Sequence, residues 1–213
     1  MEVRRILSCV LMMTLLLTGC GKGTDDSPEQ LAALIRAEYL SLDKWSSTVN
    51  LSVEYGEQVF DFTVDALWQR DGDTVLTITE PELVAGITAR IRDGETLLEY
   101  DGAGLSLGML DLNGLTPVSA IPALMGCVTA GYLARCSWSG EGESRELVIL
   151  CRDPNAAPQE GTEAEIYIDP VTHALKRAEV SVNGKLRLTA QFTDFTMELN
   201  VDETGTDENL GRN

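Results

Sequence analysis

The sequence predicts an α+β fold, in which an antiparallel β-sheet of about ten strands is accompanied by two helical segments. Apolar residues recur at helical spacing in residues 28–45 and 115–133, and they alternate with polar residues through most of the remaining chain. Three Asp-Gly pairs and Asn183-Gly184 separate the alternating runs, which is the strongest short-range signal of a β-hairpin. A long antiparallel meander follows from these observations.

The first helix is expected to begin after Ser27. Ser27 can cap the helix, Pro28 suits its first position, and Gln30 stands where a capping-box partner would be. An apolar stripe follows at helical spacing, with Trp45 near its end: Leu31, Leu34, Ile35, Tyr39 and Leu42. A helix with one apolar face needs a surface to cover, so we expect it to lie on the sheet.

From Ser47 the apolar period changes from 3.6 to 2, which is typical of strands with one buried face. The opposite face is rich in Thr and charged residues. The runs expected to form strands are 49–55, 60–68, 76–78, 87–91, 98–100, 105–110, 136–138, 147–151, 163–169, 175–182, 185–192 and 195–199.

The segment 115–133 interrupts this rhythm with a second helical stripe. Thr116-Pro117 resembles a cap followed by a first-turn proline, and Pro122 is expected to split or kink the helix. Its apolar stripe is Val118, Ile121, Leu124, Met125 and Val128. A strongly twisted sheet of this size tends to curl, which leaves a hollow for the two helices.

The N-terminus has the order of a secretory signal. Arg4 and Arg5 precede an apolar run of about a dozen residues, too short for the roughly 20 needed to span a bilayer as a helix. Leu17-Thr18-Gly19-Cys20 resembles the lipobox of bacterial lipoproteins, which implies cleavage before Cys20 and lipidation of its thiol. The alternative is an ordinary secretory signal in which this cysteine stands by chance.

The lipobox resemblance divides the chain into four parts. We expect a lipoprotein signal peptide at 1–19, a lipidated N-terminus and flexible spacer at 20–27, one domain at 28–201 and an acidic, fraying tail at 202–213. Two acyl chains hold a protein stably on a membrane. The expected location is therefore the extracytoplasmic face of the cell membrane, with the lipid on Cys20 as the anchor.

The charge of the chain constrains its partners. With 16 basic and 34 acidic residues the net charge is −18, and removal of residues 1–19 leaves 14 basic and 33 acidic residues, a net charge of −19. Nucleic acids and anionic membrane surfaces attract basic patches, so neither is expected as a partner. The acidic surface instead suits solubility and keeps the domain away from lipid headgroups.

Three cysteines lie in the expected domain: Cys127, Cys136 and Cys151. Their spacing matches no Cys-x-x-Cys metal or redox motif, and an odd number leaves at least one unpaired. A Cys136–Cys151 bridge and three buried thiols are both compatible with the sequence.

Residues for catalysis or for binding a metal or cofactor are sparse. The only histidine, His173, falls in a polar turn with no evident nucleophile, and no phosphate-binding glycine loop is present. The acidic pairs Asp61/Asp65 and Glu163/Glu165 share strand faces, but no loop has the dense oxygen ligands of a calcium site. We therefore expect these acids on the solvated face of the sheet, and we expect a non-enzymatic protein that needs no metal or cofactor.

Two stretches of this sequence resemble the LolA/LolB-like lipoprotein-carrier fold. They are DGDTVLTITEPELVAGITARIRDGETLLEYDGAGLSLGML, at 71–110, and EIYIDPVTHALKRAEVSVNGKLRLTAQFTDFTMEL, at 165–199. The resemblance implies an unclosed β-barrel, a curved antiparallel sheet forming a half-barrel with helices covering its concave apolar face. Members of this fold carry acyl chains or other lipids, or are envelope lipoproteins that bind proteins, some of them in spore germination.

The resemblance also suggests a ligand-binding face. Alternation places a set of apolar residues on the inner face of the sheet, where a packed core alone would explain them. The carrier resemblance adds that the same face leaves room for an acyl chain. The candidate ligand-binding residues are Phe60, Phe62, Val64, Trp68, Ile78, Ile87, Ile91, Leu98, Tyr100, Ile168, Val180, Leu188 and Phe192.

Two functions remain open at this point. The first is an anchored lipoprotein that binds an acyl chain or other apolar ligand in lipid or lipoprotein handling. The second is a non-catalytic module that binds and regulates an envelope or cell-wall protein, for example in sporulation or germination, through an exposed strand edge or the outer face of the sheet. The soluble carrier has no lipid on its own cysteine, so a tether on Cys20 favours a stationary acceptor, sensor or partner over a shuttle.

Overall fold

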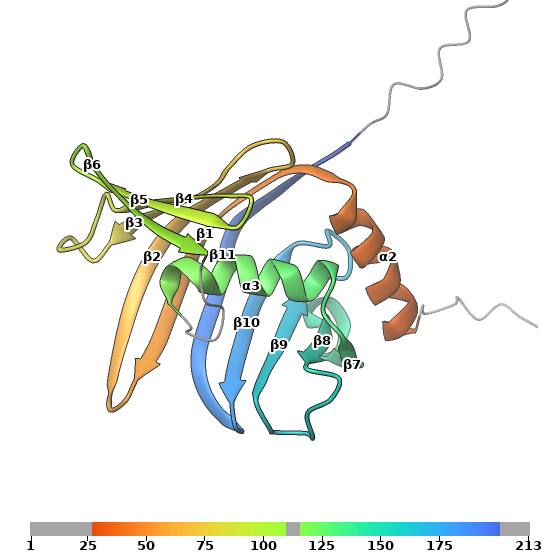
Figure 1. Cartoon of the computed structure of the whole chain (residues 1–213). Helices are drawn as coiled ribbons and strands as arrows, with labels where there is room; N and C mark the ends of the chain where they lie inside the picture. The colour runs from red at the N-terminus through yellow and green to blue at the C-terminus, as the bar shows by residue number, and fades with distance from the viewer. Residues whose placement is uncertain (1–26, 110–115, 201–213) are drawn as a thin grey trace, which may run out of the picture.

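The computed structural model describes residues 27–109 and 116–200. The expected signal peptide, Cys20, almost all of the spacer and the acidic tail lie outside the described residues. Within them the chain forms the predicted α+β half-barrel, with 11 antiparallel strands in one open, curved sheet (Figure 1). No helix among the described residues combines the length and the hydrophobicity needed to span a membrane.

The two helices are α2 (Pro28–Leu40) and α3 (Pro117–Thr129), and a short 3₁₀ turn covers Gly142–Ser144. The strands are β1 (Leu42–Tyr55), β2 (Gln58–Gln69), β3 (Thr74–Glu80), β4 (Thr88–Arg92), β5 (Glu95–Tyr100), β6 (Ala103–Met109), β7 (Leu133–Ser139), β8 (Glu146–Arg152), β9 (Thr162–Ile168), β10 (Leu175–Val182) and β11 (Lys185–Leu199).

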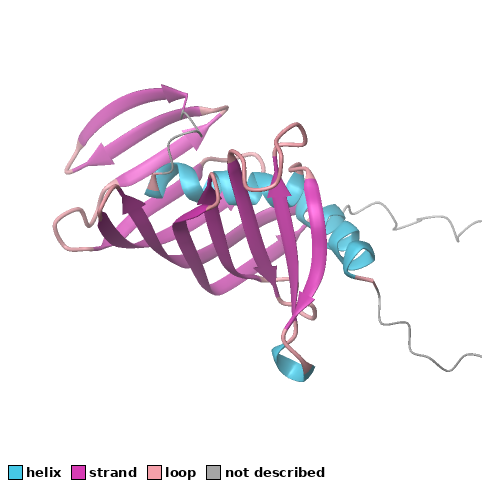
Figure 2. Ribbon diagram, turned by 90° about the horizontal axis from the view of Figure 1, so that it is seen from below, coloured by secondary structure: helices cyan, strands magenta, loops and turns pink. Residues whose placement is uncertain are grey.

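The first and last strands meet at the centre of the sheet. The strand order is β6-β5-β4-β3-β2-β1-β11-β10-β9-β8-β7. Strands β1 to β6 follow one another from the centre to one edge of the sheet. Strands β7 to β11 follow one another from the opposite edge back to the centre. The chain must pass from β6 to β7, at opposite edges, and α3 belongs to this connection. It lies across the concave face and contacts β2 and β9 (Figures 1 and 2).

The strand register separates an apolar inner face from a polar outer face. Val49 on β1 lies opposite Val64 on β2 and Phe192 on β11, and all three are buried in one continuous core. The outer face carries exposed ion pairs, such as Arg135 with Glu165 at 2.6 Å. The predicted alternation of apolar and polar residues along the strands is thereby confirmed.

Both predicted helix starts are confirmed, whereas the first helix ends earlier than expected. Ser27 and Gln30 form the reciprocal hydrogen bonds of a capping box, and Thr116 caps α3. α2 ends at its C-cap Ser41, where both the amide and the hydroxyl donate to the Glu38 carbonyl. Leu42 and Trp45 therefore belong to β1, and the prediction that they continue the helical stripe is wrong.

Pro122 does not split the second helix, so this part of the expectation is wrong. α3 is continuous from Pro117 to Thr129 with Pro122 inside it. Proline costs the helix one hydrogen bond because it has no backbone N–H. Ile121 and Leu124, on either side of Pro122, are almost completely buried against the sheet. Burial of this apolar face offsets the missing hydrogen bond.

Three of the four predicted Gly-containing turns have the backbone of a type I′ turn, with both residues at positive φ. The φ angles are 52° and 83° at Asp93-Gly94, 47° and 79° at Asp101-Gly102, and 51° and 73° at Asn183-Gly184. The connection through Asp71-Gly72 is different, because neither residue has positive φ and the Gly72 amide donates to the Gln69 carbonyl at 3.1 Å.

An arginine of α2 binds the C-terminus of α3. Arg36 Nε donates to the Val128 carbonyl at 2.9 Å, and Nη2 donates to the carbonyls of Cys127 at 3.2 Å and Gly131 at 2.6 Å. The last carbonyls of a helix lack intrahelical partners and carry partial negative charge, and α3 has no basic residue in its last turn. Arg36 supplies these hydrogen bonds and joins the two helices.

We expect Arg36→Ala to lower the free energy of unfolding by about 2 kcal/mol, because three hydrogen bonds to a charged group are lost and the carbonyls of Val128 and Gly131 lose this donor. Urea unfolding measures this change. Lys44→Ala is the control, since Lys44 pairs with Glu198 in an exposed salt bridge of 3.1 Å and its loss should cost less than about 1 kcal/mol. Equal losses in the two variants would show that Arg36 does not hold the helices together.

Candidate ligand-binding site

An apolar cavity of about 230 Å³ lies between α3 and the sheet. Its lining comes from the end of α2, the start of β1, the end of β2, the start of β3 and one side of α3. The lining residues are Tyr39, Leu42, Trp45, Trp68, Thr74, Pro122, Met125, Gly126 and Thr129.

The sheet side of the cavity is aromatic. Trp45 on β1 and Trp68 on β2 are directly opposite cross-strand partners. The Phe195 ring is stacked on Trp45 at 5.9 Å and on Tyr39 at 6.3 Å between centroids. Large rings packed against one another leave few rotamers available, so this wall is rigid and apolar.

The helix side of the cavity is one face of α3. Pro122, Met125, Gly126 and Thr129 follow the spacing i, i+3, i+4 and i+7, which places them on the same side of a helix. A Cβ atom at Gly126 would meet nothing within 4 Å outside the helix itself. Glycine is unfavourable inside a helix, and here it leaves open space beside the cavity.

The cavity has few polar groups. The Thr129 hydroxyl donates to the Met125 carbonyl at 3.0 Å, within α3. The Tyr39 hydroxyl donates to the His173 carbonyl at 2.8 Å, and burial together with the neighbouring Glu38 charge raises the pKa of Tyr39, so its ring stays neutral. A site of this chemistry suits an apolar group.

Of the ligand-binding residues expected from the sequence, Trp68 lines this cavity. Six others are buried in the packed core: Val64, Ile78, Ile168, Val180, Leu188 and Phe192. Phe62, Ile87, Ile91 and Leu98 are half-buried against that core, while Phe60 and Tyr100 are exposed near strand ends. The structure therefore places the set along the whole inner face, and one member at the cavity.

Most of the cavity lining was missed by strand periodicity because it comes from the helices and from strand ends. Tyr39 and Met125 had been noted only as members of helical stripes. The available signal was the recurrence of Pro122, Met125 and Thr129 on one side of the second helix, together with the paired tryptophans.

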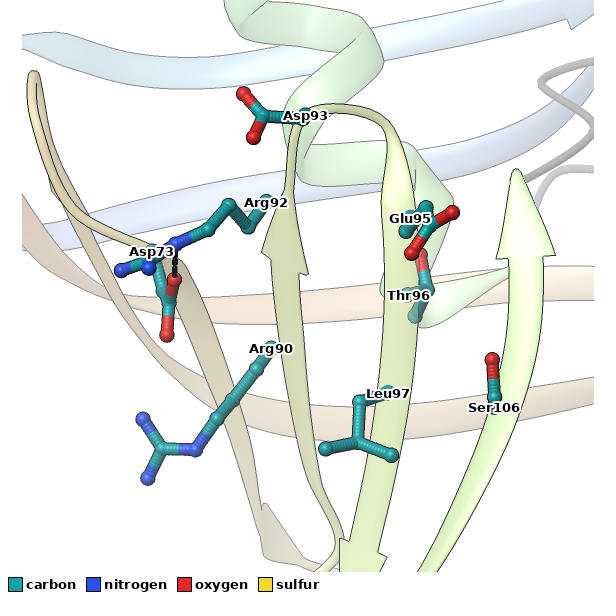
Figure 3. A pocket seen from close by; sticks show the side chains of 8 residues that line it. All are labelled: Asp73, Arg90, Arg92, Asp93, Glu95, Thr96, Leu97 and Ser106. Carbon is teal, nitrogen blue, oxygen red and sulfur yellow. Dashed lines mark ion pairs between the residues drawn. The ribbon is translucent and has the colours of Figure 1, made fainter.

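Two larger hollows in the described part of the chain are lined mainly by polar and charged residues. One of about 550 Å³ beside the β4–β5 hairpin is lined by Arg90, Arg92, Asp73 and other mostly polar residues, with an Arg92–Asp73 ion pair of 2.5 Å (Figure 3). Another, of about 720 Å³, follows outer-face positions of β1, β2 and β11 and includes Asp61 and Glu80. Neither has the apolar character expected of a lipid site.

His173 has a structural position. Its Nδ1 is paired with the Glu38 carboxylate, and its carbonyl accepts the Tyr39 hydroxyl hydrogen bond, so the turn 169–174 is held against α2. The amides of Val171 and Thr172 donate to Asp169, and the Thr172 amide lowers the pKa of that carboxyl. Within the described ranges, no three His, Cys, Asp or Glu side chains are grouped so as to hold a metal ion.

Comparison with solved structures finds proteins of similar fold. A LolA superfamily protein from Nitrosomonas europaea has a TM-score of 0.42 and 14% identity, covering 83% of this chain and 96% of that one. The Mycobacterium tuberculosis lipoprotein LppX has a TM-score of 0.39 and 18% identity, covering 83% and 100%. A chain in the structure of the Clostridioides difficile CwlD amidase with the GerS lipoprotein has a TM-score of 0.41 and 12% identity, covering 81% and 96%.

A protein of the LolA superfamily, which the sequence resembles, is thus among these structures. No protein-family model matches the sequence. A comparison with curated proteins also gave no match.

We expect His173→Ala to lower the free energy of unfolding by about 1 kcal/mol, through loss of the contact with Glu38, and to leave the binding of apolar ligands unchanged. Thermal unfolding and ligand titration measure the two effects. Val171→Ala is the matched control, since Val171 is exposed in the same turn and only its backbone is hydrogen-bonded. A His173→Ala protein of normal stability that has lost its biological activity would instead point to catalysis.

Proposed function

We propose that this protein is a membrane-anchored, extracytoplasmic lipoprotein whose half-barrel binds an acyl chain or other apolar ligand in lipid or lipoprotein handling at the cell envelope. The observation that carries this proposal is the apolar cavity between α3 and the paired tryptophans. Ligand sites are usually concave and mostly apolar with few polar groups, and this cavity fits that description.

The volume of the cavity limits what it holds. At about 230 Å³ it is smaller than the roughly 300–1,000 Å³ of sites for drug-sized ligands and larger than the roughly 150 Å³ that accommodates benzene. It therefore suits the end of one acyl chain or a single ring, with the remainder of a longer ligand outside.

The anchor and the non-enzymatic character are further parts of the proposal. Leu17-Thr18-Gly19-Cys20 supports lipidation of Cys20, so the half-barrel receives its ligand at the membrane to which it is attached. No catalytic step is included, because His173 is engaged with Glu38 and Tyr39 and lies in a turn rather than facing a nucleophile.

A cavity-filling variant tests the proposed site. In a chain starting at residue 21, a fatty acid with a spin label on its acyl chain should quench the fluorescence of Trp45 and Trp68, which line the cavity. We expect Gly126→Leu to fill the space beside the cavity and weaken this saturable quenching at least tenfold, a loss of about 1.4 kcal/mol in binding free energy.

Gly126→Ala is the matched control, because it makes a similar backbone change with one methyl group and should bind almost normally. Both variants replace glycine within a helix and should be at least as stable as the parent. Unchanged binding in Gly126→Leu would show that the ligand lies elsewhere, and absence of saturable quenching in the parent protein would contradict the proposed function.

A second candidate function, binding of an envelope protein, is favoured by the edge strand β6. Ala103–Met109 contains no charged residue, and Leu105 and Leu107 are 61% and 45% exposed. An edge strand without charge readily accepts a strand from another chain. The opposite edge strand β7 carries Arg135 and contacts α2.

We expect Leu105→Lys to abolish capture of such a partner while leaving fatty-acid binding intact, because a lysine on an edge strand opposes strand addition. Crosslinking in intact cells, followed by mass spectrometry of the captured proteins, is the measurement. Leu83→Lys is the control, since Leu83 is 89% exposed in a neighbouring turn. An identical set of captured proteins from both variants and the parent would contradict a role for the β6 edge.

A further inference from the structure

Two thiols meet where α3 contacts the sheet. Cys127 is half-buried near the C-terminus of α3, and Cys151 is 3% exposed on β8 beneath it. The Cys151 thiol donates to the Cys127 carbonyl at 3.4 Å. The helix α3 crosses the hollow, and the strand β8 lies below it. Each of these two elements therefore places one cysteine at the same point.

The third cysteine is less well placed for a bridge to Cys151. On the paired strands β7 and β8, Cys136 lies opposite Ile149 and Cys151 lies opposite Leu133. Cys136 and Cys151 are therefore diagonal rather than directly opposite, with a register shift between the two pairs. Diagonal neighbours on regular paired strands are about 7–8 Å apart at their Cα atoms. Disulfides rarely form when the Cα atoms are more than roughly 7 Å apart, unless the backbone moves.

The surroundings give the two meeting thiols different reactivities. A side-chain hydrogen bond from the Cys151 thiol to the Cys127 sulfur lowers the pKa of Cys127, assisted by the Arg36 charge and opposed by burial. The same interaction, together with burial, raises the pKa of Cys151. Because the thiolate is the nucleophile in disulfide exchange, Cys127 is the thiol that attacks first.

We propose that Cys127 and Cys151 form an intramolecular disulfide by exchange with a small-molecule or protein disulfide. The Cys127 thiolate attacks one sulfur of the incoming disulfide and releases one thiolate. Cys151 then loses its proton and attacks the Cys127 sulfur of the mixed disulfide, which releases the second thiolate. Two protein thiols are oxidised and one external disulfide is reduced to two thiols.

The bond would tie α3 to the sheet beside the cavity. Cys127 follows Gly126 directly and stands between two residues of the cavity lining, Gly126 and Thr129. External disulfides are kept oxidised outside the cytoplasm, where the N-terminal sequence is expected to direct the chain. The effect on ligand entry rests on the proposed function, whereas formation of the bond does not.

Peptide mapping tests the bond directly. The mature protein, isolated from membranes in detergent, is reduced, treated with oxidised glutathione, alkylated and digested with trypsin. Cleavage after Arg135 and Arg145 places each of the three cysteines in a separate peptide. We expect the Cys127 and Cys151 peptides to be linked, and we expect the midpoint of thermal unfolding to rise by roughly 6–12 °C, reversibly with dithiothreitol.

Single substitutions identify the partners. Cys136→Ser should keep both the linked peptides and the rise in midpoint, while Cys127→Ser and Cys151→Ser should lose both. A Cys136–Cys151 or Cys127–Cys136 link in the parent protein would overturn the proposal. The proposal would also be overturned if all three thiols stayed free in the folded protein while the same oxidant linked the cysteines of the protein unfolded in urea. Fatty-acid binding by the reduced protein is measured separately, so failure of the proposed function can be distinguished from failure of the disulfide proposal.

Discussion

The structure depends on one topological constraint, which is that β6 and β7 are consecutive strands at opposite edges of one sheet. Their connection has to cross the sheet, and it does so on the apolar side with α3, a helix about 20 Å long. A polar connecting segment would leave the inner face of the sheet exposed, whereas α3 buries Ile121 and Leu124 against this face. The cavity beneath the helix follows from this arrangement.

A helix held only by apolar contacts is free to slide along the face that it covers. Arg36 limits this freedom because its guanidinium binds three carbonyls at the end of α3, so the position of α3 is set by α2 as well as by the sheet. The turn containing His173 in turn holds α2 through Glu38 and Tyr39. A series of polar contacts therefore fixes the position of α3 relative to Trp45 and Trp68.

Elements with a strong local signal were predictable from the sequence, and the cavity was not. The inner face, the capping box at Ser27 and the Asn183-Gly184 turn follow from spacing and backbone preference, which act within a few residues. Trp45 had been assigned to the end of a helix because its spacing fits one, but Ser41 ends that helix first. Which side chains surround an empty space depends on how distant elements meet, and neither periodicity nor turn chemistry records this.

The pairing of the first and last strands also has a consequence for how the chain folds. Residues as far apart as Lys44 and Glu198 are joined across β1 and β11, and contacts between distant residues slow folding. Until residue 199 has been synthesised, the inner edge of β1 has no complete partner, and the half-sheet from β1 to β6 exposes two open edges. The centre of the sheet is therefore complete only once β11 is in place, and a chain without this strand exposes an additional edge open to aggregation.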